Sequence, residues 1–253
     1  MGVEQLSDLT LVALVLVAFI AGFVSAIAGS GGLIVLPVLL TAGVPPLNAL
    51  ATNKFQSVCG TLTSTINFLR KGHLDLASVR GTVIYALVGA ALGTLTVQQI
   101  SPELLKQILP FILILLAIYI ALSPRMSDSD HEPRWSRNRF DCLVGGGVGF
   151  YGGFLGPAMG SFYAVAYSAL RGYNLRRATA HTKPLVLTVN FTSLTLFILA
   201  GHVWWKLALM MAAAQVVGAR LGSQLVIDRG AALVQPVLIG VTLLLALKLL
   251  VFP

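Results

Sequence analysis

Two lysines lie inside segments that are otherwise apolar enough to cross a membrane. Lys54 is part of "LNALATNKFQSVCGTLTSTINFL", and Lys183 is part of a second apolar segment at 178–200. On a helix, each lysine shares a face with an amide or hydroxyl seven residues later and a serine ten residues later. These residues are Thr61 and Ser64 in the first segment, and Asn190 and Ser193 in the second. Because ammonium groups and neutral donors replace the hydration of anionic oxygens, the pattern favours binding of a small anion.

The neighbours of the two lysines extend this candidate site. Asn53 precedes Lys54, and Thr182 and His181 precede Lys183. His181 could titrate beside the lysine, although a hydrogen-bonded or interfacial histidine is the more common case. An ionisable side chain in a spanning segment usually faces the bundle interior or a wet cavity. Each lysine is only one to two turns from the start of its segment, so snorkelling toward lipid headgroups is the alternative.

Glycine clusters interrupt the apolar pattern once in each half of the chain. The first is "AGSGG" at 28–32, with Ser30 and Gly31, and the second is "GGFLGPAMG" at 152–160, with Gly156. Such breaks could let backbone amides and helix ends approach an anion, or they could only permit a tight reversal; both interpretations stay open. No GxSxG motif frames Ser30, so we expect no enzyme activity.

Acidic residues, histidines and cysteines limit the chemistry further. None of the nine Asp and Glu residues lies in the middle of an apolar segment, whereas cation carriers need a buried carboxylate. The four histidines are scattered, and Cys59 and Cys142 are typical of packing residues, so the sequence predicts no metal site and no cofactor.

The composition is that of an integral membrane protein. Of 253 residues, 57% are hydrophobic and 10% are charged, against roughly 45–50% and about 25% in soluble domains. The net charge of +8 comes from basic residues in short loops between apolar segments. Membrane topology explains these better than a polyanionic partner does, so we expect contact with the lipid bilayer and no nucleic acid.

Ten apolar segments predict an all-α integral membrane fold. They fall at about 9–28, 33–42, 49–69, 79–97, 107–122, 140–156, 160–170, 178–200, 204–225 and 235–252. About eight are long enough to span. The segments at 33–42 and 160–170 would rise only about 15 Å as helices, so we expect two short broken or re-entrant pieces beside the glycine clusters.

The two halves of the chain repeat each other. The alignment that places "ALATNK" (49–54) on "ATAHTK" (178–183) also places "GAALG" (89–93) on "GARLG" (218–222), and a nearly equal shift places "GFVSAIAG" (22–29) on "GFYGGFLG" (149–156). The small-xxx-small pattern of "GAALG" and "GARLG" indicates close helix packing. We expect a first transmembrane repeat at 1–122, a linker at 123–139 and a second repeat at 140–253. Five elements per repeat make the repeats inverted, as in secondary transporters with broken helices.

Basic residues predict the orientation in the membrane. With a cytoplasmic linker, the inner loops and the linker hold eleven basic residues and the outer side holds three, which is a strong positive-inside bias. This bias predicts a multi-pass plasma-membrane protein with both termini outside.

Several motifs, taken in order, resemble one known family. "ATNKFQ" with its following Ser/Thr-rich helix, the loop "RKGHLD", "HTKPLVLTVNFTSL" and "VVGARLGSQLVIDRG" resemble the TauE/SafE family over about residues 12–250. This family is also called the sulfite exporter or 4-toluene sulfonate uptake permease family. The resemblance implies a transporter that moves sulfite, thiosulfate or small organosulfonates, commonly outward.

The sequence therefore predicts a secondary transporter of a small sulfur-containing oxyanion. Lys54 and Lys183 would anchor the anion, and the glycine breaks would act as hinges. A coupling proton or ion and a homo-oligomer are left open. The alternatives are a channel-like facilitator of a small anion or solute, and a membrane scaffold that does not transport.

Overall fold

The computed structural model describes residues 6–121 and 129–229, and this part of the chain consists of helices joined by loops, without strands. The first half contains α1 (Asp8–Ala28), α2 (Gly32–Thr41), α3 (Pro46–Arg70), α4 (Arg80–Gln98) and α5 (Pro102–Ala121). The second half contains α6 (Arg137–Phe140), α7 (Gly146–Phe154), α8 (Met159–Arg171), α9 (Leu175–Leu199) and α10 (Trp205–Arg229). A π-helical turn at Asp141–Gly145 joins α6 and α7 into one rod. The predicted segment at 235–252 and both chain ends lie outside the described residues.

The helices carry the length and polarity of membrane spans. Within the described residues, four stretches are long and apolar enough to cross a membrane: Asp8–Ala28, Ala77–Gln98, Leu175–Leu199 and Trp205–Asp228. Large apolar side chains such as Leu16, Leu92 and Val217 are more than half exposed on their outer faces. Lipid is the solvent that such faces require, which confirms the all-α membrane fold. The count of about eight spans stays a prediction.

α1 and α7 both end inside the bundle, at the two glycine clusters. Gly29 ends α1 with a φ of 74°, and Gly156 has a φ of 97° in the break after α7. Ala158 also has a positive φ, 62°, which no other described non-glycine residue has. The two breaks touch, because a Cβ on Gly29 would lie 2.7 Å from the Cα of Gly160. α2 and α8 follow the breaks as the two short helices that the sequence predicts.

Helix contacts come in pairs that follow the sequence repeat. α10 lies along α1, where a Cβ on Gly218 would overlap the carbonyl oxygen of Phe19. α4 lies along α7 in the same way, and a Cβ on Gly89 would overlap the carbonyl oxygen of Gly146. The absence of a side chain permits this approach of the backbones. The prediction that "GAALG" and "GARLG" mediate close packing is confirmed.

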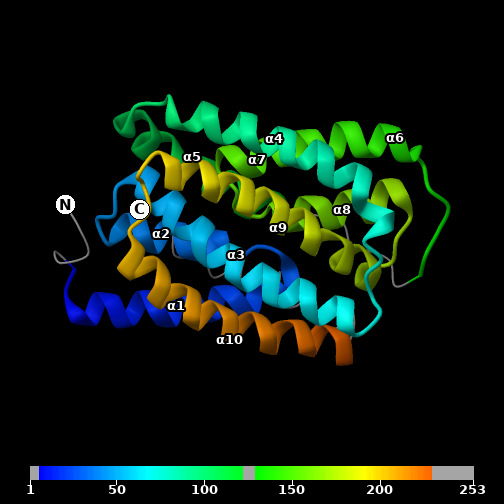
Figure 1. Ribbon diagram of the computed structural model, residues 1–253, viewed down its shortest axis with the longest axis horizontal. Helices are drawn as coiled ribbons and strands as arrows, with labels where there is room; N and C mark the ends of the chain where they lie inside the picture. Colours follow the sequence, from blue (N-terminus) through cyan, green and yellow to red (C-terminus); the bar gives the residue numbers. More distant parts are fainter. Residues whose placement is uncertain (1–5, 122–128, 230–253) are drawn as a thin grey trace.

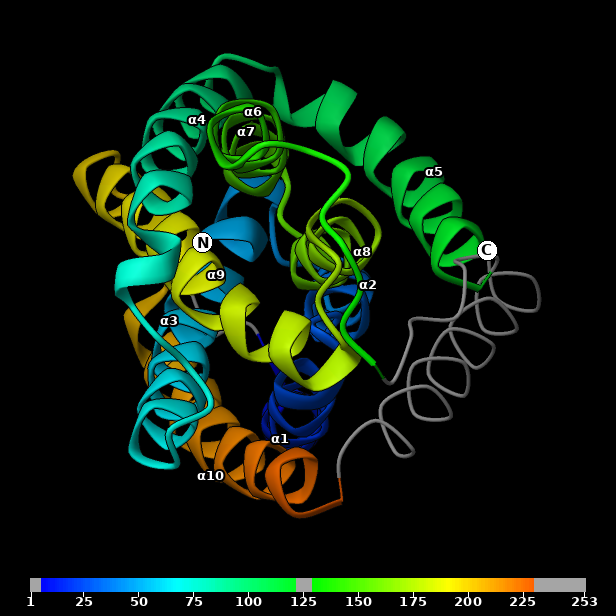
Figure 2. The same ribbon diagram turned by 90° about the vertical axis from the view of Figure 1, so that its right-hand side faces the viewer.

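The two halves run in opposite directions. α1 and α3 point in one direction along the bundle, while their counterparts α7 and α9 point in the opposite direction (Figure 1). Viewed end-on, α3 and α9 lie between the α1–α10 pair and the α4–α7 pair (Figure 2). Inverted repeats would produce this arrangement, and it brings the two lysine-bearing helices into the centre.

The described part of the linker lies at one end of the bundle, beside the loops that precede α4 and α9. Arg137 donates a hydrogen bond to the carbonyl of Ala77 at 2.9 Å. Asp130 accepts one from the backbone N–H of Asn174 at 2.7 Å and pairs with Arg177 at 2.9 Å. The N–H of Asn174 and the guanidinium of Arg177 hold the pKa of Asp130 below its ordinary value. Three regions that the sequence places on the cytoplasmic side therefore share one end; the side itself stays a prediction.

Candidate functional site

Both lysines lie inside the bundle. The side chain of Lys54 is fully buried and that of Lys183 is 3% exposed. Each lysine lies eight residues after the first residue of a 25-residue helix, α3 or α9, which is about 12 Å along the helix axis. The snorkelling interpretation is wrong, because both ammonium groups bond to the protein interior.

Each ammonium group binds the end of the broken helix in the opposite half. Lys183 donates a hydrogen bond to the carbonyl of Ser25, near the end of α1, at 3.1 Å. Lys54 donates one to the carbonyl of Gly152, near the end of α7. Ser25 and Gly152 are themselves equivalent in the repeat, because the alignment of 22–29 on 149–156 places one on the other. The C-terminal end of a helix carries a partial negative charge, so these carbonyls partly compensate the buried cations.

Hydroxyl groups satisfy further carbonyls at the same helix ends. Ser161 of the second half donates to Ala28 of α1 at 2.7 Å. Thr94 of the first half donates to Gly153 of α7 at 3.1 Å. Broken helices within a membrane require such partners, because no lipid group can bond to the free carbonyls. The hydroxyl oxygen of Ser193 lies 2.8 Å from that of Thr94, so Ser193, a predicted site residue, belongs to the packing of α4 on α9.

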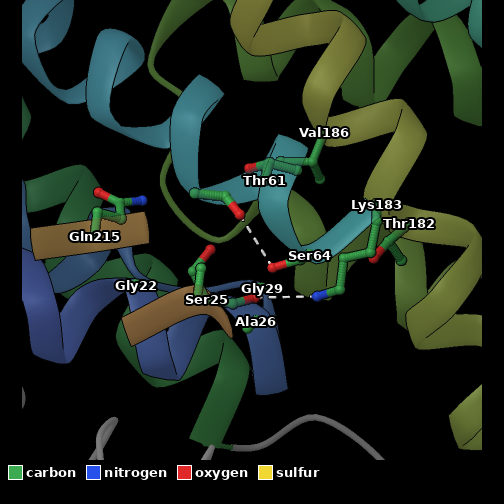
Figure 3. Close-up of a pocket in the computed structure, with 12 residues that line it drawn as sticks. Gly22, Ser25, Ala26, Gly29, Thr61, Ser64, Thr182, Lys183, Val186 and Gln215 are labelled. Atoms are coloured by element: carbon green, nitrogen blue, oxygen red, sulfur yellow. Dashed lines mark hydrogen bonds between the residues drawn. The ribbon is translucent and has the colours of Figure 1, made fainter. Parts of the chain in front are cut away.

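A small closed cavity lies beside Lys183, between α1, α3, α9 and α10 (Figure 3). The centre of a water-sized sphere can occupy about 10 Å³ of it, which is room for about one water molecule. Four predicted site residues line the cavity: Lys183, Thr182, Thr61 and Ser64. The structure therefore brings one lysine together with three hydroxyl groups from two helices.

The hydroxyl groups of the cavity bond to their own helices in this state. Ser64 donates to the carbonyl of Gly60 at 3.1 Å, and Thr182 donates to the carbonyl of Thr179 at 2.8 Å. Rotation about χ1 would release these hydroxyl donors to a ligand. The cost in free energy is small, because the carbonyls that they leave keep their backbone hydrogen bonds within the helix.

The surroundings of Lys54 differ. A Cβ on Gly156 would lie 2.6 Å from the Nζ atom of Lys54, so this position has no room for a side chain. Asn53 is buried and accepts a hydrogen bond from Gln56 at 3.2 Å. Its amide also faces the first residue of α2, since a Cβ on Gly32 would lie 3.4 Å from its Nδ2 atom. These residues pack the two breaks together.

The remaining predicted residues lie away from the cavity beside Lys183. Ser30 is buried in the first break, and its hydroxyl has no partner among the described residues. Gly31 packs on the carbonyl of Ala21, which a Cβ at this position would overlap. Asn190 is buried in α9 and does not line this cavity.

His181 lines a different, open cavity of about 390 Å³ at the linker end of the bundle. Its Nε2 atom is 3.0 Å from the hydroxyl of Ser78, and its Nδ1 atom is 2.8 Å from the carbonyl of Arg177. Arg176 lines the same cavity. His181 is thus a buried histidine with hydrogen-bond partners at both ring nitrogens, which is the more common role of this residue type.

Sequence reasoning missed three residues. Ser25 and Gln215 line the cavity beside Lys183, and Asp141 is buried in the π-helical turn, where it accepts a hydrogen bond from Thr82. Gln215 carried a detectable signal, because it is the sole polar residue in "LALMMAAAQVVGA". Ser25 had no such signal, since its backbone carbonyl is what binds the lysine.

The polar side chains that line the cavity are an ammonium group, hydroxyls and an amide, all of which can donate hydrogen bonds. The described residues contain no cluster of three or more His, Cys, Asp or Glu side chains. One ammonium group, four hydroxyls and an amide line the cavity instead. Donors of this kind stabilise a small anion that has lost its hydration shell.

The chain is similar to proteins described as membrane transporters. The family model for the sulfite exporter TauE/SafE matches residues 14–249. The probable membrane transporter protein YfcA of Escherichia coli (strain K12) is 43% identical over 97% of this chain and 91% of its own length. A probable membrane transporter protein of Haemophilus influenzae is 39% identical over 92% of this chain and 91% of its own length. No solved structure matches the chain significantly.

Proposed function

The chain belongs to the sulfite exporter TauE/SafE family of membrane transporters, and we propose that it is a secondary transporter that exports a small sulfur-containing oxyanion. The contact between Lys183 and Ser25 carries this proposal. A buried ammonium group whose hydrogen bond goes to a carbonyl is poorly compensated, because a carbonyl dipole is a weaker partner than a full negative charge. An anion entering the cavity would gain more from Lys183 than the carbonyl does.

The closed cavity supports a carrier rather than a channel. Room for about one water molecule beside Lys183 is too small for an oxyanion with three oxygens, so binding requires the helices to separate. The breaks supply hinges, because Gly29 and Gly156 adopt positive φ and Ala158 does so against its steric preference. The buried position of both lysines also argues against a scaffold, in which they would reach the headgroups.

The contacts between the halves suggest how access could alternate. Each lysine holds the broken helix of the other half, and corresponding helices run in opposite directions. Exchange of the two equivalent sets of contacts would therefore open the site first to one side of the membrane and then to the other.

Flux measurements test the proposal. Full-length protein in proteoliposomes should carry sulfite or a small sulfonate with saturation and counterflow. Lys183→Met should lower the flux about 10- to 150-fold, as loss of a charge-assisted contact of about 1.5–3 kcal/mol predicts. Lys206→Met is the matched control, because Lys206 is exposed. Unchanged flux in Lys183→Met would overturn the site assignment, and flux without counterflow would favour a channel.

A further inference from the structure

Gln215 of α10 faces the cavity from the side opposite Lys183. Gln215 is 3% exposed, and it is the polar residue in an otherwise apolar stretch of the helix. Figure 3 shows Gln215 and Lys183 on opposite sides of the residues that line the cavity. The amide group therefore shares the cavity with the ammonium group without bonding to it.

Two neighbouring helices leave space for this side chain. A Cβ on Gly22 of α1 would lie 2.8 Å from the Cγ atom of Gln215, and a Cβ on Gly60 of α3 would lie 2.8 Å from the same atom. Any larger residue at either position would displace the glutamine. The place of Gln215 is therefore built by α1 and α3 together.

The carbonyl oxygen of this amide is unused. Among the described residues, the Oε1 atom of Gln215 has no hydrogen-bond partner although it is buried. A buried acceptor without a donor costs free energy, which a ligand recovers if it brings an N–H or O–H group to that atom. Figure 3 draws the amide nitrogen toward the cavity and Oε1 away from it, so a half-turn about the last side-chain torsion brings this acceptor to the cavity. A ligand with a donor would then satisfy it.

The charge of the cavity limits the ligand as well. Among its lining residues, Lys183 is the one that carries a formal charge. A single ammonium group compensates one negative charge, and a second charge would be left unpaired in a buried site. The cavity therefore suits a monoanion.

We propose that Gln215 is a specificity-determining residue that accepts a hydrogen bond from the transported anion. The site then selects a small monoanion that has an oxyanion head on Lys183 and an O–H or N–H group on Gln215. Hydrogen sulfite has this chemistry, whereas sulfate carries two charges and no donor. The inference rests on the proposed function and adds the protonation state and donor of its substrate.

Two probes of equal charge and similar size test this assignment. Sulfamate and methanesulfonate share an anionic SO₃ group. Sulfamate carries an amino group on the sulfur, where methanesulfonate carries a methyl group. In thermal unfolding titrations of the purified full-length protein, sulfamate should bind at least about 10-fold more tightly than methanesulfonate. Sulfate should bind more weakly than either. Equal affinity of the wild-type protein for sulfamate and methanesulfonate would overturn the inference.

Gln215→Met removes the acceptor and keeps the length of the side chain. This variant should bring the two affinities within about 2-fold of each other by weakening sulfamate alone. Gln224→Met on the same helix is the control, because Gln224 is exposed, and it should keep the wild-type ratio. A wild-type ratio in Gln215→Met would refute the role of Gln215.

The outcomes separate this inference from the proposed function. If both probes bind equally and Lys183→Met abolishes their binding, the anion site stands and the role of Gln215 is refuted. If neither probe nor sulfite binds, the proposed function and the inference both fail.

Discussion

Replacing each buried lysine by methionine should separate the functional role of the charge from its contribution to stability. In Lys183→Met, the carbonyl of Ser25 keeps a hydrogen bond from the N–H of Gly29 at 2.9 Å, so no acceptor is orphaned. The lost charge-assisted bond contributes about 1.5–3 kcal/mol, while the burial of an ammonium group costs several kcal/mol. The free energy of unfolding should therefore stay the same or rise by about 1–4 kcal/mol.

Lys54→Met should be less favourable for stability. The N–H of Gly156 bonds to Tyr151, so the carbonyl of Gly152 depends on the ammonium group of Lys54. Its removal leaves a buried acceptor unpaired, at a cost of about 1–3 kcal/mol. Lys54→Met should thus be less stable than Lys183→Met by about this amount.

Thermal and chemical unfolding of the detergent-solubilised variants measure both effects. A difference of about 1 kcal/mol corresponds to about 2–4 °C for a domain of this size. Lys206→Met, an exposed control, should match the wild type. Stabilisation of the wild type by sulfite should vanish in Lys183→Met. The reasoning would be refuted if Lys183→Met lowered the free energy of unfolding by more than about 3 kcal/mol, because the lysine would then be a structural element.

Three further predictions concern the breaks and the linker. Gly156→Ala should lower transport and the unfolding temperature, because the new Cβ atom would meet the ammonium group of Lys54. Gly201→Ala is the control and should lower transport little, because Gly201 also has a positive φ, 73°, but has open space around it. Thr94→Val should lower the free energy of unfolding by about 1–3 kcal/mol, measured by chemical unfolding, since it orphans a carbonyl of α7. Because the pKa of Asp130 is lowered in the folded protein, its contribution to stability is present at neutral pH and is lost as pH falls through that pKa. The hydrogen-exchange protection factors of residues 129–136, which correct for the intrinsic pH dependence of exchange, should fall at acidic pH, and Asp130→Asn should show the lower protection already at neutral pH.

The sequence predicted the helices, the breaks and the burial of both lysines' segments, because these depend on local periodicity and on a repeat within the chain. It placed Thr61 and Ser64 on one face with Lys54, whereas in the structure they line the cavity beside Lys183 of the other half. It did not separate them from Asn190 and Ser193, since residues on one face of a long helix can contact different neighbours at different depths. The partners of the lysines were not predictable either, because a backbone carbonyl of the other half leaves no trace in residue type.

The repeat relates the two lysines, but the structure surrounds them differently. In the alignment that places Lys54 on Lys183, Gln215 corresponds to Ala86, and Gly60 corresponds to Val189. The glutamine and the glycine help to form the polar cavity at Lys183. At Lys54, a methyl group of Val189 lies 2.7 Å from where a Cβ on Gly152 would stand. The glutamine and the glycine at Lys183 therefore have apolar counterparts, Ala86 and Val189, at the other lysine. We expect one bound anion per chain, measured by calorimetric titration of the detergent-solubilised protein. A stoichiometry of two would show that an anion also binds at Lys54 and that the repeats remain equivalent in function.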